Sequence, residues 1–422
     1  MGRSLAKLGR RMAIGAVLIV SGCSSTSPSA TPPSASPPVV TVVPTPAPSA
    51  TASLAAIPAS TPAASPSPIP TPVPTPSNSP PRPLTASAWK EVPSQASVRG
   101  VQLLDVVWTG TRFIAVGSDA VLDSTDGVRW HRQKSRWTGG DAHLAAGPVG
   151  VVAVDATGSW TSRDGLSWVA HPKAFRVANI GSDSVDVTDV VATSGGWIAV
   201  GSQDPPCSFD CRDHTRALVW TSDDGAHWTR VPDQKAFAGG GMETVARTTN
   251  GFIAAGGAAS NAAIWTSPDG QAWSRVPDSK MFHGPDGSSL EATGVSVRGT
   301  DIAVVGLVGY SDPPSARAWW SSDGETWSKA PVEKGKSGQM FSVAATIDGF
   351  LAAGPSGGDS CLGGIWASTD GHAWRCDAPQ RRFAGFGPYA IAASDTVEVA
   401  VGLSDRGDDA PPDGAIFSRT WN

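Results

Sequence analysis

The chain has 422 residues, of which 16% are charged and 40% hydrophobic, and its formal net charge is −5. This length is enough for a large folded domain with a core of its own. The mild negative charge, without a basic stripe, argues against nucleic acid as a partner. Composition changes sharply along the chain, which divides it into a leader, a Pro-rich segment and a Trp- and Gly-rich domain.

The first residues predict export to the cell envelope. Basic residues up to Arg11 precede an apolar run at positions 12–20. The run is shorter than the roughly 20 apolar residues that span a bilayer, so it predicts a signal peptide over residues 1–22. The sequence Val20–Cys23 resembles a bacterial lipobox, which implies a lipidated Cys23 and a membrane anchor on the extracytoplasmic face of a bacterial membrane. An ordinary signal peptide with a chance Cys is the alternative.

The segment from residue 23 to 86 predicts an extended tether. It consists almost entirely of Pro, Ser, Thr and Ala, with no aromatic residue and no charge before Arg82. Such a composition cannot bury enough apolar surface to fold. We therefore expect a spacer between a membrane anchor and the folded domain, which begins near residue 87.

One motif, Ser-x-Asp-Gly-x-x-Trp, recurs six times in the remaining chain. Its acidic positions are Asp126, Asp164, Asp224, Asp269, Asp323 and Asp370. They are separated by 38, 60, 45, 54 and 47 residues, which is the period of a propeller blade. Asp-Gly between two apolar runs predicts a hairpin turn, because Gly tolerates positive φ.

A second repeat alternates with the first. Seven apolar strands, usually preceded or followed by Gly, occur at 113–117, 151–154, 197–201, 252–256, 302–306, 350–354 and 397–402. Continuous runs of β-branched and small residues are typical of strands buried on both faces. Their small residues predict that they lie near the propeller axis.

The two ends of the domain predict how the ring closes. Residues 415–421 match a third strand without a fourth, whereas Trp89–Pro93 matches the fourth strands that follow the Asp-Gly turns. The N-terminal segment should therefore supply the outer strand of the last blade, which removes an open sheet edge. The predicted fold is all-β: a seven-bladed β-propeller of four-stranded blades over residues 87–422.

The six-fold motif is similar to the Asp-box, or BNR repeat, of sialidases and other propellers, with one residue fewer between Asp and Gly. The resemblance extends over the whole folded domain. In that family the box lies between the third and fourth strands, where Asp and Ser bond backbone N–H groups and Trp packs between hairpins. The resemblance implies that the six Asp residues are structural.

The same resemblance raises the possibility of sialidase activity. Sialidases use three Arg for the substrate carboxylate, a Tyr nucleophile paired with Glu, and an Asp as acid/base. The chain has only two Tyr residues, Tyr310 and Tyr389, and no Arg-Ile-Pro motif. Tyr310 shares a loop with Asp312, and Glu291 lies earlier in the same blade. The favoured hypothesis is a non-catalytic binding module for a protein or glycan, with no cofactor. A divergent sialidase-type hydrolase is the alternative, and an envelope assembly factor is a third.

Four cysteines remain after Cys23, in the pairs Cys207/Cys211 and Cys361/Cys376. An even number in an exported domain predicts two disulfides. Zinc binding by Cys207, Cys211 and His214 is the alternative for the first pair, but the spacing is poor for zinc.

The long, irregular loops should all emerge on one face of a propeller, opposite the tight Asp-Gly turns. Such a rim is where binding residues usually lie on a rigid scaffold. The candidate residues in these loops are Tyr310, Asp312, Arg406 and Asp408. The acidic loop 405–413 lacks a calcium-binding spacing, so we predict no metal site.

Overall fold

The computed structural model describes residues 86–93, 98–134, 137, 139–177, 181–206, 214–309, 315–333, 338–355, 361, 364–377, 385–404 and 413–421. The predicted signal peptide and the predicted tether lie outside these residues. Within the described ranges, no helix combines the length and apolar character that crossing a membrane requires.

The described chain forms seven antiparallel sheets of four strands each, as predicted. Blades 1 to 3 contain β2 (Leu103–Trp108), β3 (Phe113–Gly117), β4 (Ala120–Ser124), β5 (His131–Arg132); β6 (His143–Gly147), β7 (Gly150–Asp155), β8 (Gly158–Ser162), β9 (Val169–Pro172); and β10 (Ser184–Ala192), β11 (Trp197–Asp204), β12 (Arg216–Ser222), β13 (Thr229–Arg230). Blades 4 and 5 contain β14 (Gly240–Thr248), β15 (Gly251–Ala258), β16 (Asn261–Ser267), β17 (Ser274–Arg275); and β18 (Leu290–Arg298), β19 (Asp301–Val308), β20 (Ser315–Ser321), β21 (Ser328–Ala330). Blades 6 and 7 contain β22 (Ser342–Ala345), β23 (Phe350–Ala353), β24 (Ile365–Ser368), β25 (Arg375–Cys376); and β26 (Phe386–Ala393), β27 (Val397–Ser404), β28 (Asp413–Thr420), β1 (Lys90–Glu91). The 3-10 turns η2 (Lys235–Phe237), η3 (Lys280–Phe282) and η4 (Pro285–Gly287) lie between blades.

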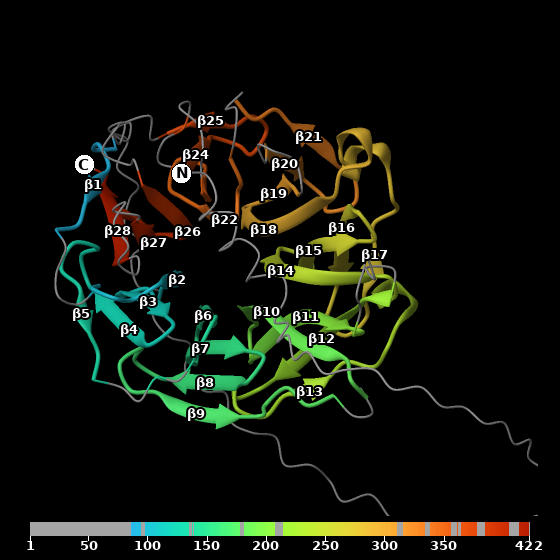
Figure 1. Ribbon diagram of the computed structural model, residues 1–422, viewed down its shortest axis with the longest axis horizontal. Coiled ribbons are helices and arrows are strands. Elements are labelled where there is room, and N and C mark those ends of the chain that lie inside the picture. Colours follow the sequence, from blue (N-terminus) through green and yellow to red (C-terminus); the bar gives the residue numbers. More distant parts are fainter. Residues whose placement is uncertain are drawn as a thin grey trace, which may run out of the picture. The chain divides into compact units, whose positions relative to one another are not determined.

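The first strand of each blade lies at the centre of the ring (Figure 1). These strands contact one another in an unbroken circle, from β2 through β6, β10, β14, β18 and β22 to β26 and back to β2. The expectation that the buried second strands lie nearest the axis is therefore wrong. The second strands are small and apolar because sheets of neighbouring blades cover both of their faces. For example, every residue of β3 is buried.

The core lies between neighbouring blades, where large side chains alternate with small ones. Third-strand tryptophans such as Trp220, Trp265 and Trp319 are at most 1% exposed. Phe237 and Phe282, which belong to the 3-10 turns between blades, are also buried. The Trp265 and Trp319 indoles donate hydrogen bonds to backbone carbonyls beside these turns, so the connections between blades are held by the same side chains that fill the core.

The six Ser-x-Asp-Gly-x-x-Trp segments form the turns between third and fourth strands. In each, the Asp carboxylate accepts a hydrogen bond from the backbone N–H of the residue after Gly. Around Asp269, Ser267 Oγ also accepts from Gly270 N at 2.8 Å, and Trp273 Nε1 donates to Gly270 O at 3.0 Å. The backbone N–H groups of Thr326 and Glu325 lower the pKa of Asp323 to about 2. The six Asp carboxylates therefore accept hydrogen bonds from the backbone of their own turns.

In four of the six turns, those of Gly127, Gly165, Gly225 and Gly270, the Gly has two separate reasons to be Gly: a positive φ and no room for a Cβ. Gly270 has φ +77°, and a Cβ there would lie 2.3 Å from Ile198 Cδ1 of the preceding blade. Gly299, in a hairpin of blade 5, has φ +63°, but a Cβ there would have no neighbouring atom within 4 Å. We expect Gly299→Ala to cost about 1 kcal/mol of unfolding free energy, from backbone strain alone. Gly270→Ala should cost about 1–3 kcal/mol more, because the methyl group overpacks a buried interface. Chemical denaturation of both variants measures the difference, and equal losses would contradict the packing argument.

The ring closes with the N-terminal segment, as predicted. Strand β1 pairs with β28 in antiparallel register, with Lys90 opposite Ser418 and Glu91 opposite Phe417. Ala86 forms a β-bridge with Trp421. The backbone N–H of Trp421 donates to Thr396 O in the first hairpin of blade 7. Both ends of the described chain therefore lie on the face that carries the short turns.

One of the two predicted disulfides is present: Cys361 is bonded to Cys376. It joins the connection between β23 and β24 to the outer strand β25 of the same blade. Cys207 and Cys211 lie outside the described residues, as does Cys23.

Candidate functional site on the inner strands

A register shift recurs in the inner strands and determines which side chains reach the loop-bearing face. In five blades the first strand has one extra residue relative to the second, and these bulge residues are Leu104, Thr188, Glu243, Thr293 and Tyr389. In the other two blades, the residue directly before the inner strand lies at the same level as the bulges. These residues are Ala142, before β6, and Phe341, before β22. We call these seven residues the inner bulge ring. Bulges redirect side chains and are common beside functional sites.

The inner bulge ring lies close to the loop-bearing face. Each inner strand starts opposite the end of a second strand, and that end leads into a loop between second and third strands. Thus Ser184 pairs with Asp204, and Phe386 pairs with Ser404. The inner bulge ring comes three to four residues after these starts in β10, β14, β18 and β26.

Two residues of the inner bulge ring connect blades. The hydroxyl of Thr188 donates to Met242 O at 2.7 Å, and the hydroxyl of Thr293 donates to Met340 O. In each case the acceptor belongs to the next blade. Phe341 and Tyr389, from blades 6 and 7, stack with their ring centroids 5.9 Å apart and an interplanar angle of 20°. Both aromatic side chains are half-buried.

Glu243, the acidic member of the inner bulge ring, lies within a group of carboxylates from three blades. Burial, and after it the negative charges of Glu291, Asp204 and Asp186, raise its pKa to about 8. Asp204 accepts hydrogen bonds from Ser202 Oγ at 2.7 Å and Thr215 Oγ1 at 2.6 Å, which fix its orientation. We call Asp186, Asp204, Glu243 and Glu291 the acidic group. The raised pKa means that Glu243 takes up a proton more readily than a free Glu side chain.

Two aspartates, each one residue after a member of the inner bulge ring, form hydrogen bonds to the backbone of a neighbouring blade. Asp105 accepts a hydrogen bond from Leu144 N of blade 2 at 2.7 Å, and Asp189 accepts from Val245 N of blade 4 at 2.8 Å. Burial raises the pKa of Asp105 to about 7 and that of Asp189 to about 6, in spite of these bonds. The charge of Asp189 also raises the pKa of Asp105. Their role in the fold is to hold adjacent inner strands in register.

His143 occupies the same level in blade 2. Burial lowers the pKa of its imidazole to about 4, although the charge of Asp155 acts in the opposite direction. His143 is therefore neutral near pH 7 and does not offset the acidic group. Within the described ranges, no three His, Cys, Asp or Glu side chains are arranged to hold a metal ion.

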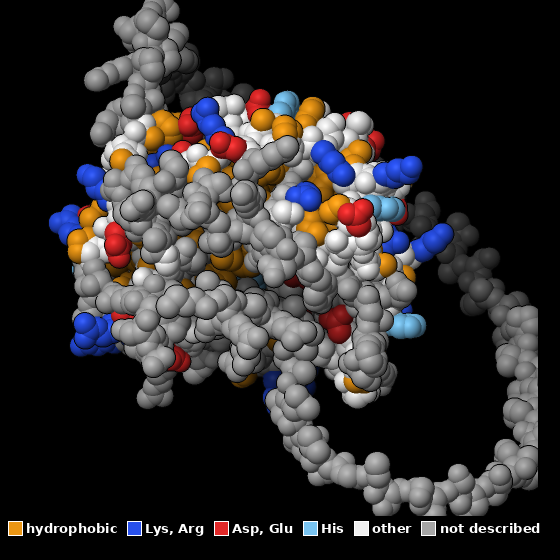
Figure 2. All heavy atoms as spheres, turned by 45° about the horizontal axis from the view of Figure 1, so that its top comes forward, with side chains coloured by type: hydrophobic (Ala, Val, Ile, Leu, Met, Phe, Trp, Pro, Cys, Tyr) orange, Lys and Arg blue, Asp and Glu red, His pale blue; other side chains and the backbone are white. Residues whose placement is uncertain are grey.

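The basic side chains of the described inner strands lie at the opposite end of these strands from the acidic group. In the described inner strands the basic residues are Arg247 and Arg298, both near the short-turn end, and Arg298 donates to Thr346 O and Ile347 O. On the face seen in Figure 2, several described Lys and Arg side chains gather at the upper right, and others lie near the outline. In the described inner strands, the charged side chains nearest the loop-bearing end are thus acidic, and Arg247 and Arg298 lie at the other end.

A groove on the opposite face lies between the short turns of blades 3 and 4. Its volume is about 640 Å³, and its lining includes Ser194, Asn250 and Gln271. The Asp269 carboxylate in its wall accepts hydrogen bonds from the backbone of its own turn. This groove is a product of the repeated hairpins.

The loop residues predicted as binding candidates, Tyr310, Asp312, Arg406 and Asp408, lie outside the described residues. Tyr389 lies in the inner bulge ring, and Glu291 lies in the acidic group beside Glu243. Sequence reasoning did not single out Glu243 or the bulges.

A signal for the bulges is nevertheless present in the sequence, because six of the seven second strands have a Gly at the level of the bulge, within the strand or directly after it. A Cβ at Gly256 would lie 2.2 Å from Gly241 O, and one at Gly306 would lie 2.0 Å from Glu291 O. The bulge pushes these first-strand carbonyls against the second strand, so a side chain has no room there. The same approach occurs at Gly117, Gly201, Gly354 and Gly402.

Comparison with known protein families agrees with this architecture. The family model of the DUF6242 beta propeller domain matches residues 77–305. The chain belongs to this family. No relative was found among curated protein sequences.

Several solved structures resemble this member of the DUF6242 beta propeller family. YCF48 bound to a D1 peptide has 16% identity and a TM-score of 0.48, over 80% of this chain and 95% of that chain. A glycoside hydrolase has 10% identity and a TM-score of 0.38, over 79% and 92% of the two chains. An α-L-arabinofuranosidase from Fusarium graminearum, in complex with an iminosugar inhibitor, has 14% identity and a TM-score of 0.40, over 79% and 97%. Identity this low is no guide to activity.

Proposed function

We propose that the protein is a lipid-anchored, extracytoplasmic binding module that receives a positively charged segment of a partner protein at its loop-bearing face. The observation that carries the proposal is the acidic group: Asp186, Asp204, Glu243 and Glu291 converge from three blades at the start of the inner strands. Lys and Arg side chains are the natural complements of such a group.

The aromatic members of the inner bulge ring support a peptide rather than a glycan as the ligand. Phe341 and Tyr389 present stacked, half-buried rings. Aromatic faces attract ammonium and guanidinium groups and also pack against the apolar stems of Lys and Arg. Few glycans carry positive charge, whereas basic peptide segments are common.

The acidic group also disfavours the sialidase alternative. A sialic acid carries a carboxylate, which in sialidases is bound by arginines, and like charges placed close together repel. The turn geometry around residues such as Asp269 supports the Asp-box assignment, but it serves the fold and not catalysis. The lipobox-like sequence ending at Cys23 supports the anchor. Incorporation of a labelled fatty acid by the full-length chain, and its loss in Cys23→Ser, tests that part.

Binding of cationic peptides tests the main proposal. We expect a fluorescent Lys-rich peptide to bind the protein, more weakly at higher salt, and an acidic peptide of the same length not to bind. Glu243→Gln/Glu291→Gln should weaken binding by about tenfold. Affinity should rise between pH 6.5 and pH 8.5, because the pKa of Glu243 is raised to about 8 and its proton leaves in this range. Fluorescence anisotropy measures all three effects.

Glu325→Gln is the matched control, because Glu325 is an exposed residue at the apex of a short turn on the opposite face. It should bind like the unaltered protein. Equal binding by Glu243→Gln/Glu291→Gln, or tighter binding of the acidic peptide, would overturn the proposed function. Release of sialic acid from a sialoside by the purified protein would favour the hydrolase instead.

A further inference from the structure

The closure of the ring is held at its outer edge by four side chains, Trp89, Asp377, Glu398 and Arg419, which we call the closure latch. Asp377 Oδ2, from blade 6, accepts hydrogen bonds from Trp89 Nε1 at 2.9 Å and from Arg419 Nη1 at 2.6 Å. Arg419 Nε donates to Glu398, and its guanidinium lies over the Trp89 ring at 4.9 Å. One carboxylate of blade 6 thus contacts both the first and the last segments of the ring.

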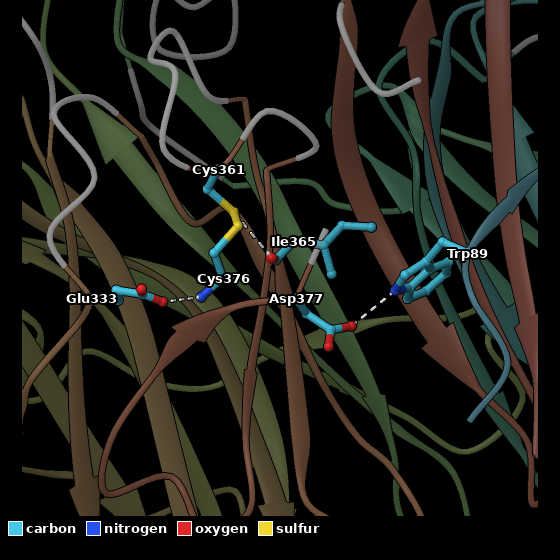
Figure 3. Close-up of a disulfide and its surroundings, with 6 residues drawn as sticks. All are labelled: Trp89, Glu333, Cys361, Ile365, Cys376 and Asp377. Atoms are coloured by element: carbon cyan, nitrogen blue, oxygen red, sulfur yellow. Dashed lines mark hydrogen bonds between the residues drawn. A yellow bond between two sulfur atoms is a disulfide. The ribbon is translucent and has the colours of Figure 1, made fainter. Parts of the chain in front are cut away.

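Asp377 follows directly on Cys376, so its position depends on the end of β25 (Figure 3). Strand β25 has only two residues, paired at Trp366–Cys376 and Ala367–Arg375. Its other described ties are the bond from Cys376 N to Glu333 Oε2 at 2.8 Å, the bond from Asp377 N to Ile365 O at 2.9 Å, and the disulfide to Cys361. Among these described ties the disulfide is the covalent one, and it is the one that a reductant removes while the hydrogen bonds remain.

The two cysteine residues differ in exposure. Cys361 is 2% exposed, whereas Cys376 lies half-buried at the outer edge of the blade. We therefore expect a small thiolate to attack at Cys376 rather than at Cys361. Access to one sulfur is sufficient for thiol–disulfide exchange, which proceeds by attack on a single sulfur.

We propose that the Cys361–Cys376 disulfide is a redox-sensitive restraint on the closure of the ring, that is, on the pairing of β1 with β28. We call this restraint the fastener. A dithiol reductant transfers two electrons and two protons to the disulfide, which yields two cysteine thiols, while the dithiol is oxidised to its own disulfide. The end of β25 then loosens, Asp377 leaves Trp89 and Arg419, and β1 separates more readily from β28. In an oxidising compartment the disulfide persists and the ring stays fastened. This inference is independent of the proposed function.

Hydrogen exchange on the full-length protein, with and without dithiothreitol, tests the proposal. Reduction should speed exchange of the amides of residues 87–92 by at least about tenfold, the size expected when a local opening becomes easier. Amides of β15, on the far side of the ring, should exchange at an unchanged rate. Because the folded protein is reduced in place, the test does not require a cysteine variant to fold.

Two variants separate the fastener from other effects of reduction. In Cys361→Ser/Cys376→Ser, residues 87–92 should exchange fast already, and dithiothreitol should have no further effect on them, even if it reduces Cys207 and Cys211. In Asp377→Asn, reduction should alter exchange in β25 but change residues 87–92 much less than in the unaltered protein. Asp233→Asn, which removes a carboxylate paired with Arg216 and Arg230 in blade 3, should retain the full response. Unchanged exchange at residues 87–92 on reduction, or an equal response in Asp377→Asn, would overturn the proposal.

Discussion

Replacing Arg419 with Met is expected to lower the free energy of unfolding by about 3–5 kcal/mol, because it leaves the Glu398 carboxylate buried without its positive partner. Glu398 is 0% exposed, and Arg419 is 8% exposed. Burial raises the pKa of Glu398, while the charge of Arg419 lowers it. Arg419 also bonds Asp377 and lies over Trp89, so its loss weakens the contact between blades 6 and 7 as well. Urea denaturation measures the loss.

Two comparisons show whether charge burial is the cause. Arg129→Met removes a guanidinium that pairs with Asp126 but is 79% exposed, and should cost less than about 1 kcal/mol. In a Glu398→Gln background, Arg419→Met should cost clearly less than in the unaltered protein, because no buried charge is then left unpaired. If the cost is the same in both backgrounds, packing rather than charge explains the role of Arg419.

Lowering the pH from 8 to 6.5 is expected to raise the free energy of unfolding by about 2 kcal/mol. The folded-state pKa values of Glu243 and Asp105 are raised to about 8 and about 7, from ordinary values of 4.5 and 3.8. A carboxyl whose pKa is raised by folding takes up a proton in the folded state first, so acidification through that pKa stabilises the fold. Glu243 contributes most of the change, because with a pKa of about 8 its folded state is at least half protonated across the whole window, whereas Asp105, with a pKa of about 7, takes up its proton mainly below pH 7.

Below pH 6.5, His143 should offset part of this gain. Folding lowers the pKa of His143 to about 4, so protonation of the unfolded chain below pH 6.5 destabilises the fold. Glu243 and Asp105 together outweigh this one imidazole, so thermal unfolding should still show the stability rising from pH 6.5 toward pH 5. Glu243→Gln should flatten the slope between pH 6.5 and pH 8, and Glu325→Gln should leave it unchanged. A slope that survives Glu243→Gln would place the titrating group elsewhere.

The blade count and the closure could be predicted because each depends on short local patterns. Asp-Gly between apolar runs specifies a turn whatever surrounds it, and the likeness of Trp89–Pro93 to other fourth strands identified the missing strand of blade 7. The order of strands from the axis was predicted wrongly for β3 and its counterparts. A small, apolar composition shows that a strand is buried on both faces. It does not show whether the strand lies next to the axis or further out between two neighbouring blades.

The acidic group could not be predicted in the same way, since it depends on distances between blades. Asp186, Glu243 and Glu291 are more than 40 residues apart from one another in sequence. Only the ring geometry brings them to one level. Glu243 also occupies a bulge, where the alternation of side chains along β14 is interrupted, so a pattern with a period of two does not assign its direction. Gly256 in β15, with its counterparts in the other second strands, is the sequence feature that marks those positions.

The antiparallel pairing of β1 with β28 has a practical consequence for handling the protein. Ala86 and Trp421 lie side by side on the short-turn face, so a tag or surface linkage attached at either end of the described propeller joins it there. Immobilisation at either of these two ends directs the opposite, loop-bearing rim toward solution. Because the two ends adjoin, they can also be linked directly, and new termini opened in an Asp-Gly turn would give a circular permutant with its ring covalently closed at β1 and β28.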